Sequence, residues 1–201
     1  MKIKPLLLLT LLSTFLVACG DGDTDSSTSF ASASIVTSIF AVGDSIGNGF
    51  GGTTPWPRLV QNGTGIIVTN NSQNGRQASG SAGLVRAGIA QFNPSHVIIM
   101  LGTNDANNGS VNSAINSMRQ IVEETQAAGV QIIVGTVPPN PGDASANSRA
   151  AQISAAYRTL GVPIAEVEGA FGNGGGLFQS DQLHPNNEGQ QLIANAFINA
   201  L

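Results

Sequence analysis

The sequence is dominated by short apolar runs that alternate with longer amphipathic segments. Residues 97–101 (Val-Ile-Ile-Met-Leu) form the clearest run, and a strand that is apolar at every position must be covered on both faces. Strands are expected at 35–42, 65–69, 97–101, 130–137 and 162–167, and helices at 56–61, 81–92, 110–128, 147–160 and 186–200. This alternation predicts an α/β fold, a three-layer α/β/α sandwich around a five-stranded, parallel, doubly wound sheet of the flavodoxin-like type.

The first 34 residues do not follow this pattern. A basic start is followed by an apolar stretch at 6–17 that is short for a bilayer span and ends at Ala18-Cys19-Gly20. This segment resembles the lipobox of bacterial lipoproteins, which predicts a signal peptide at 1–18 and a diacylglycerol on the Cys19 thiol. Gly20 in place of Asp favours delivery to the outer membrane, facing the periplasm or the cell surface. An ordinary secretory signal or a buried free cysteine remains the alternative.

Composition narrows the possible partners. Residues 19–34 are rich in Ser, Thr, Asp and Gly, which predicts a flexible tether ahead of a single domain at 35–201. Cys19 is the sole cysteine, so the chain can form neither an internal disulfide nor a cysteine zinc site. The formal net charge is -4, and an acidic surface disfavours nucleic acid. We expect a monomer whose membrane contact is the lipid on Cys19.

A candidate nucleophile follows the first expected strand. Gly43-Asp44-Ser45-Ile46 lies where the strand ends, and ligands of parallel α/β sheets bind outside the carboxyl ends of the strands. The Ser45 hydroxyl can therefore face a substrate. Alternatively, Asp44 and Ser45 only cap backbone groups of a turn.

Serine needs a base, and the chain has two histidines. His96 begins an expected strand, at the amino edge of the sheet, and is therefore expected to be structural. His184 lies in Asp181-Gln182-Leu183-His184-Pro185, ahead of the last helix. Asp181 lies three residues before His184, close enough for its carboxylate to bind the ring N–H and hold the imidazole in one tautomer. Alternatively, Asp181 caps a loop beside a surface histidine.

Acyl transfer also needs donors for the developing oxyanion. Asn104 follows the best strand and can present its side-chain amide, while Gly75 follows the second strand and allows its N–H to approach closely. The Ser45 N–H would complete the set. The alternatives are helix capping by Asn104 and an ordinary turn at Gly75. Asp105 is expected to orient loops.

A competing motif is present at residues 47–52, where Gly-Asn-Gly-Phe-Gly-Gly satisfies the Gly-x-Gly-x-x-Gly pattern of dinucleotide sites. It starts several residues after the strand ends, and Pro55 delays the following helix. The acidic residue expected after the second strand is replaced by Asn70-Asn71. We therefore interpret these glycines as a mobile loop beside Ser45.

Taken in order, four blocks of this chain resemble those of the SGNH hydrolases, also called the GDSL esterase/lipase family. The blocks begin at Gly43, Asn70, Gly102 and Asp181 and span the domain at 35–201. Ile46 stands where many members have Leu. The resemblance implies a catalytic triad of Ser45, His184 and Asp181, an oxyanion hole made by Ser45, Gly75 and Asn104, and no metal or other cofactor.

The implied activity is hydrolysis of a small-molecule carboxylic ester through an acyl-enzyme. Aromatic residues make up 5% of the chain, and Trp56 is expected in the core, so short-to-medium acyl chains are favoured over polysaccharide esters. The loops at 47–54, 138–146 and 171–178 are expected to shape the acyl pocket. Alternatives within the family are a carbohydrate O-acetylesterase and a lysophospholipase or thioesterase. An alternative of another class is a non-catalytic, ligand-binding lipoprotein.

Overall fold

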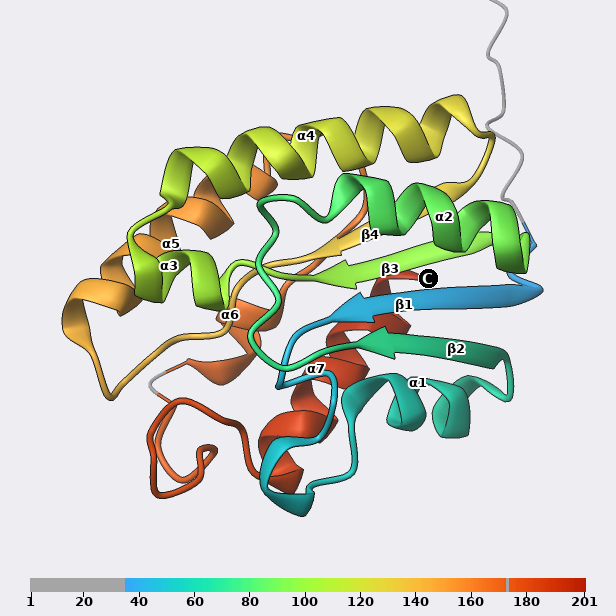
Figure 1. The fold of residues 1–201 in the computed structure, drawn as a ribbon. Coiled ribbons are helices and arrows are strands. Elements are labelled where there is room, and N and C mark those ends of the chain that lie inside the picture. Colours follow the sequence, from blue (N-terminus) through green and yellow to red (C-terminus); the bar gives the residue numbers. More distant parts are fainter. Residues whose placement is uncertain (1–34, 173) are drawn as a thin grey trace, which may run out of the picture. The chain divides into compact units, whose positions relative to one another are not determined.

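Five parallel strands form one sheet in the order β2-β1-β3-β4-β5 (Figure 1). The structure is a computed structural model and describes residues 35–172 and 174–201. The strands are β1 (Ser38–Gly43), β2 (Ile67–Ser72), β3 (His96–Met100), β4 (Gln131–Gly135) and β5 (Ile164–Ala165). This order is that of the flavodoxin-like, doubly wound sheet, and it confirms the predicted fold class.

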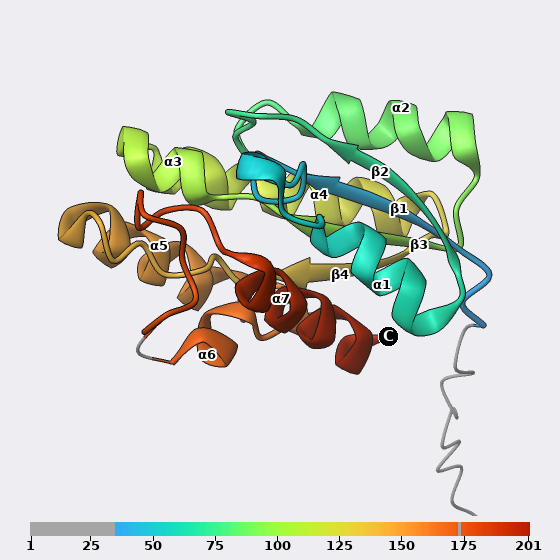
Figure 2. The ribbon, with the colours of Figure 1, turned by 90° about the horizontal axis from the view of Figure 1, so that it is seen from below.

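Helices cover both faces of the sheet, as Figures 1 and 2 show. One face packs against α2 (Ala82–Phe92), α4 (Val111–Ala127) and α5 (Ala144–Tyr157). The other packs against α1 (Trp56–Thr64), α6 (Val167–Phe171) and α7 (Asn187–Ala200). Two short helices, η1 (Phe50–Gly52) and α3 (Thr103–Asn108), follow β1 and β3.

Alternate residues of each central strand enter different cores. In β1, Phe40 and Val42 belong to the core under α2, α4 and α5, whereas Ile39 and Ala41 belong to the core under α1, α6 and α7. Because both faces are buried, each central strand is apolar after its first residue. Trp56 is fully buried in the second core and stacks on Phe197 with ring centroids 4.5 Å apart, as expected.

The strand bounds differ from the sequence prediction: β1 begins three residues later than expected, β4 ends two residues earlier, and β2 and β5 have informative causes. β2 continues through Asn70 and Asn71 because these residues pair in register with Ala41 and Val42 of β1, which overrides the low strand propensity of asparagine. β5 has two residues where six were expected. Pro163 precedes it and cannot donate to a ladder, and Val167 already begins α6.

Helix boundaries also shift. α5 begins at Ala144, three residues earlier than expected, because the Asp143 side chain caps it by accepting from the Ala146 N–H at 3.0 Å. α1 extends to Thr64 and ends at Gly65, whose φ of 73° closes the helix. The prediction missed α3 and α6, which are short and lack a continuous apolar stripe.

The predicted signal peptide at 1–18, Cys19 and the tether at 19–34 lie outside the described residues. Within the described residues, no helix combines the length and hydropathy needed to span a bilayer.

Two glycines of α2 provide a test of this packing. A Cβ on Gly88 would overlap the Phe40 ring, whereas a Cβ on exposed Gly83 meets nothing closer than Arg86, at 3.8 Å. We expect Gly88→Ala to lower the free energy of unfolding by about 1–3 kcal/mol through overpacking. Gly83→Ala should raise it by about 0.5–1 kcal/mol, because alanine favours the helix. Urea unfolding of both variants measures the difference, and equal effects would contradict the proposed close contact between α2 and β1.

Candidate active site

Ser45 lies in a tight turn at the carboxyl edge of the sheet, two residues after β1. The Phe50 N–H donates to the Ser45 carbonyl at 3.1 Å, and the Ile46 N–H donates to Asp44 Oδ1 at 2.9 Å. A Cβ on Gly43 would stand 2.7 Å from Ser72 Oγ, so glycine is needed where the turn meets β2. The Ser45 side chain remains partly exposed.

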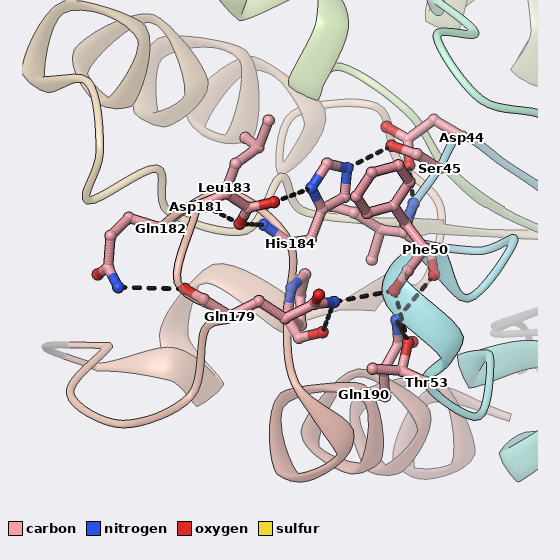
Figure 3. A network of polar contacts seen from close by, with 12 residues as sticks. Asp44, Ser45, Phe50, Thr53, Gln179, Asp181, Gln182, Leu183, His184 and Gln190 are labelled. Carbon is pink, nitrogen blue, oxygen red and sulfur yellow. Dashed lines mark hydrogen bonds and ion pairs between the residues drawn. The ribbon is translucent and has the colours of Figure 1, made fainter.

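His184 comes from the loop before α7 and meets Ser45 (Figure 3). The distance from Ser45 Oγ to His184 Nε2 is 2.9 Å, and His184 Nδ1 lies 2.7 Å from Asp181 Oδ2. Because a carboxylate only accepts, Nδ1 donates and Nε2 is left to accept from the serine hydroxyl. The structure thus brings together the three residues that the sequence suggested as a triad.

The Asp181 carboxylate is bound at both oxygens. Oδ1 accepts from the backbone N–H groups of Leu183 and His184, each at 3.0 Å, while Oδ2 faces the imidazole. Burial raises the pKa of Asp181, but the hydrogen bonds from His184 and Leu183 outweigh it and hold the pKa below its ordinary value. The carboxylate therefore stays ionised in mildly acidic solution and fixes the orientation of the ring.

The predicted oxyanion donors follow the ends of three neighbouring strands. Among the described residues, the N–H groups of Ser45 and Gly75 donate to no partner, and Gly75 has a φ of 75°. Asn104, in the first turn of α3, does not cap that helix. Its Nδ2 donates to the Arg76 carbonyl at 2.9 Å and lies 3.4 Å from Asp44 Oδ2.

Arg76 is a site residue that sequence reasoning missed. Its guanidinium donates to the carbonyls of Gly43 and Asn71 and to the side chains of Asn71 and Gln73. It therefore ties the end of β1 to the loop that holds Gly75. The available signal in the sequence was that Arg76 directly follows Gly75, the predicted oxyanion donor. Asp105, expected to orient loops, accepts from Ala78 N, Ser79 N and Ser79 Oγ at 2.7–3.1 Å.

Two glutamines from the C-terminal part of the chain bind the Ser45 loop, Gln179 from the loop that holds His184 and Gln190 from α7, and sequence reasoning missed both. Buried Gln190 accepts from the Trp56 N–H and donates to the Ile46 carbonyl, both at 2.9 Å. Gln179 donates to the carbonyls of Phe50 and Pro185 at 2.9 and 3.1 Å. No simple motif marks such amides, because most of their partners are backbone atoms, several of them far away along the chain (Figure 3).

The other sequence candidates lie as follows. His96 lies at the amino edge of the sheet, is buried, and places Nδ1 3.0 Å from Ser95 Oγ, in keeping with a structural role. The loop at 47–52 bends through positive φ at Gly49, Gly51 and Gly52 and contains η1. It is not the immediate strand-to-helix turn that a dinucleotide site requires.

Metal-ligating side chains do not cluster in the part of the chain that the structure describes, where no three His, Cys, Asp or Glu residues converge. A surface cavity of about 490 Å³ lies between β5, α6 and α7 and is not lined by Ser45, His184 or Asp181.

The chain is similar to a described family and to several solved structures. The model of the GDSL-like lipase/acylhydrolase family matches residues 41–192, whereas a comparison with curated proteins found no match.

Three solved structures show the shared fold. A member of the lipolytic protein G-D-S-L family from Veillonella parvula has a TM-score of 0.71 at 17% identity, covering 83% of this chain and 98% of that one. The psychrotrophic esterase EstA from Pseudoalteromonas sp. scores 0.64 at 22% identity, covering 82% and 96%. A catalytic mutant of Axe2, an acetylxylan esterase from Geobacillus stearothermophilus, scores 0.70 at 17% identity, covering 83% and 95%.

Asp44 allows a test of the site's electrostatics. Burial raises its pKa from 3.8 to about 6, although a hydrogen bond from the Ile46 N–H and the nearby His184 oppose the shift. The folded state therefore keeps the Asp44 proton to a higher pH than the unfolded state does. This stabilisation is complete below about pH 4 and is lost as the pH rises through about 6, with a total on the order of 3 kcal/mol.

Asp44→Asn removes this titration. Chemical unfolding at stepped pH between about 4 and 7 should show wild type losing stability relative to the variant as the pH rises. If the stability of the two proteins changed with pH in the same way, the pKa of Asp44 would not be raised in the folded state.

Proposed function

The chain belongs to the GDSL-like lipase/acylhydrolase family, and from this premise we propose that it is a serine esterase acting on carboxylic esters with short-to-medium acyl chains. The observation that supports this most directly is the continuous contact from Ser45 Oγ to His184 Nε2, at 2.9 Å, and from His184 Nδ1 to Asp181 Oδ2, at 2.7 Å. A serine with a base in hydrogen-bond reach, and a carboxylate orienting that base, is the arrangement that activates a hydroxyl.

In the proposed reaction, His184 Nε2 takes the hydroxyl proton as Ser45 Oγ attacks the ester carbonyl carbon. The tetrahedral adduct collapses when the C–O bond to the alcohol breaks, and His184 gives its proton to the departing oxygen. The product is an acyl ester on Ser45. A water molecule, deprotonated by His184, then attacks this ester and releases the carboxylic acid and the serine hydroxyl.

The oxyanion of each adduct needs donors, and three are available. The Ser45 and Gly75 N–H groups donate to no described residue. The 3.4 Å contact from Asn104 Nδ2 to Asp44 is long, so that N–H can donate to an oxyanion while the other keeps the Arg76 carbonyl. We propose that these three groups form the oxyanion hole.

The surrounding loops support a small substrate. The segment between β4 and α5 lies against the His184 loop, where the Gly142 N–H donates to the Gln182 carbonyl at 3.3 Å. Phe171, at the end of α6, and Phe178 are buried and pack on each other with centroids 5.1 Å apart, which anchors the chain at both residues. The nearby loops are thus short or anchored, which fits a compact acyl group better than a polymer.

The main alternative is a ligand-binding protein without catalysis. In such a protein the hydrogen bond between Ser45 and His184 would have no catalytic role. Loss of hydrolysis when only the Ser45 oxygen is removed therefore distinguishes an esterase from a ligand-binding protein. Ser45→Ala should lower kcat/KM for 4-nitrophenyl esters by roughly 10⁴-fold or more. The assay uses acetate, butyrate and octanoate esters with the purified full chain.

Ser113→Ala provides the matched control. Ser113 is exposed on α4, and its substitution should leave the rates unchanged. Circular dichroism of both variants shows whether the fold persists. Equal hydrolysis by wild type and a folded Ser45→Ala would refute the esterase proposal.

We further propose that the mature protein is a lipoprotein of the bacterial outer membrane, anchored through Cys19 and facing the periplasm or the cell surface. The proposal rests on the residues before and after Cys19. Residues 19–34, when extended, could span about 55 Å, enough to let the catalytic domain work away from the lipid surface.

Cys19→Ser tests the anchor, because serine has no thiol to receive the diacylglycerol. Wild type, expressed in a bacterium, should partition into the detergent phase of a Triton X-114 separation, and the variant should move to the aqueous phase or keep its signal peptide. The anchor would be refuted if the wild type stayed in the aqueous phase and mass spectrometry showed the mass of the precursor or of the cleaved chain without added lipid.

A further inference from the structure

Phe50 presents an exposed aromatic ring beside the proposed catalytic base (Figure 3). Its ring stacks on the imidazole of His184 with centroids 4.0 Å apart and planes 21° apart. The residue is 43% exposed. Among the described residues, the other exposed large apolar side chains are Ile35, Ile67 and Phe92, all at the amino edge of the sheet. Phe50 is therefore an apolar surface at the edge where the chemistry is proposed.

The backbone, not the ring, fixes the position of Phe50. Its N–H donates to the Ser45 carbonyl at 3.1 Å, and its carbonyl accepts from Gln179 Nε2 at 2.9 Å. Thr53 Oγ1 adds a contact to the same carbonyl at 3.3 Å. These bonds survive a change of the side chain. The ring is thus not needed to build the loop, and its exposed surface is open to a ligand.

The direction of the reaction places the alcohol of the ester near this ring. His184 Nε2 must reach the departing oxygen to protonate it, so the alcohol begins beside the imidazole. The carbonyl oxygen turns the other way, toward the N–H groups of Ser45 and Gly75. A ring stacked on the imidazole therefore borders the space that the alcohol enters.

We propose that Phe50 is a specificity-determining residue that forms the apolar wall of the alcohol subsite, and that the enzyme favours esters of aromatic alcohols. This inference rests on the proposed esterase function. An aromatic alcohol can pack on the free surface of Phe50, and paired aromatic rings add stabilisation beyond the apolar area that they bury. A methyl ester cannot make this contact.

The experiment compares benzyl and methyl butyrate, whose acyl group is identical and whose alcohols are of similar acidity. The ratio of their kcat/KM values cancels any general loss of catalysis. Phe50→Ala should lower the benzyl-to-methyl ratio by about three- to tenfold. Phe50→Leu, which keeps apolar bulk without the ring, should give an intermediate ratio.

Two controls separate the alcohol side from other roles. Phe92→Ala removes an exposed ring that stacks on Phe40 at the amino edge, and it should leave the ratio unchanged. Methyl acetate against methyl butyrate varies only the acyl group, and that ratio should be the same in wild type and Phe50→Ala.

Each result bears on the proposal. If Phe50→Ala slows both butyrates equally, the ring only orients His184 and the subsite is refuted. If the acetate-to-butyrate ratio changes instead, Phe50 faces the acyl group and the proposal is again wrong. If wild type hydrolyses none of these esters, the proposed function fails as well, so the two failures are distinguishable.

Discussion

The pairing of β1 with β2 on one side and β3 on the other is the constraint from which the site follows. Gly43, the last residue of β1, is in register with Ser72 of β2 and Met100 of β3. Three consecutive strands of the sequence therefore end at one level, and the loops that follow them leave the sheet together (Figure 1). This is also where the strand order reverses, and ligands of doubly wound sheets bind at that point, outside the carboxyl ends of the strands. Ser45 and Gly75 lie in the loops after β1 and β2, and Asn104 lies in the first turn of α3, which follows β3.

The imidazole comes from a distant part of the chain, and neutral amides secure it. Charged residues make up 10% of the sequence, and no ion pair links the Ser45 turn to α7 in the described residues. Gln190 instead offers a donor and an acceptor from one buried side chain, satisfying backbone groups at Ile46 and Trp56. A charged side chain in that position would require a buried counter-charge. The Gln190 amide thus joins α7 to the Ser45 turn without adding a charge near His184.

The sheet and the convergence of Ser45, His184 and Asp181 could be predicted because each depends on a strong local pattern. Strands buried on both faces must be apolar throughout, and a chain with two histidines offers few choices of base. The extension of β2, the helix α3 and the roles of Arg76 and Phe50 could not be predicted in this way. Asparagine and aspartate have weak helix and strand preferences, so tertiary pairing decides their conformation. Arg76 binds mainly carbonyl groups, and the position of Phe50 depends on Gln179, far along the chain.

The two buried acids of the site show what positions the Ser45 N–H. Asp105 accepts three hydrogen bonds at 3.1 Å or less from the loop after Gly75. Asp44 has one short bond, from the Ile46 N–H, and one long contact, from Asn104. Burial therefore raises the pKa of Asp44 to about 6. The bond to Ile46 folds the turn so that the intervening Ser45 N–H is left without a partner. The turn that buries Asp44 costs free energy, and the same turn leaves the Ser45 N–H without a partner beside the serine hydroxyl. A free donor in this position is the condition that an oxyanion hole requires.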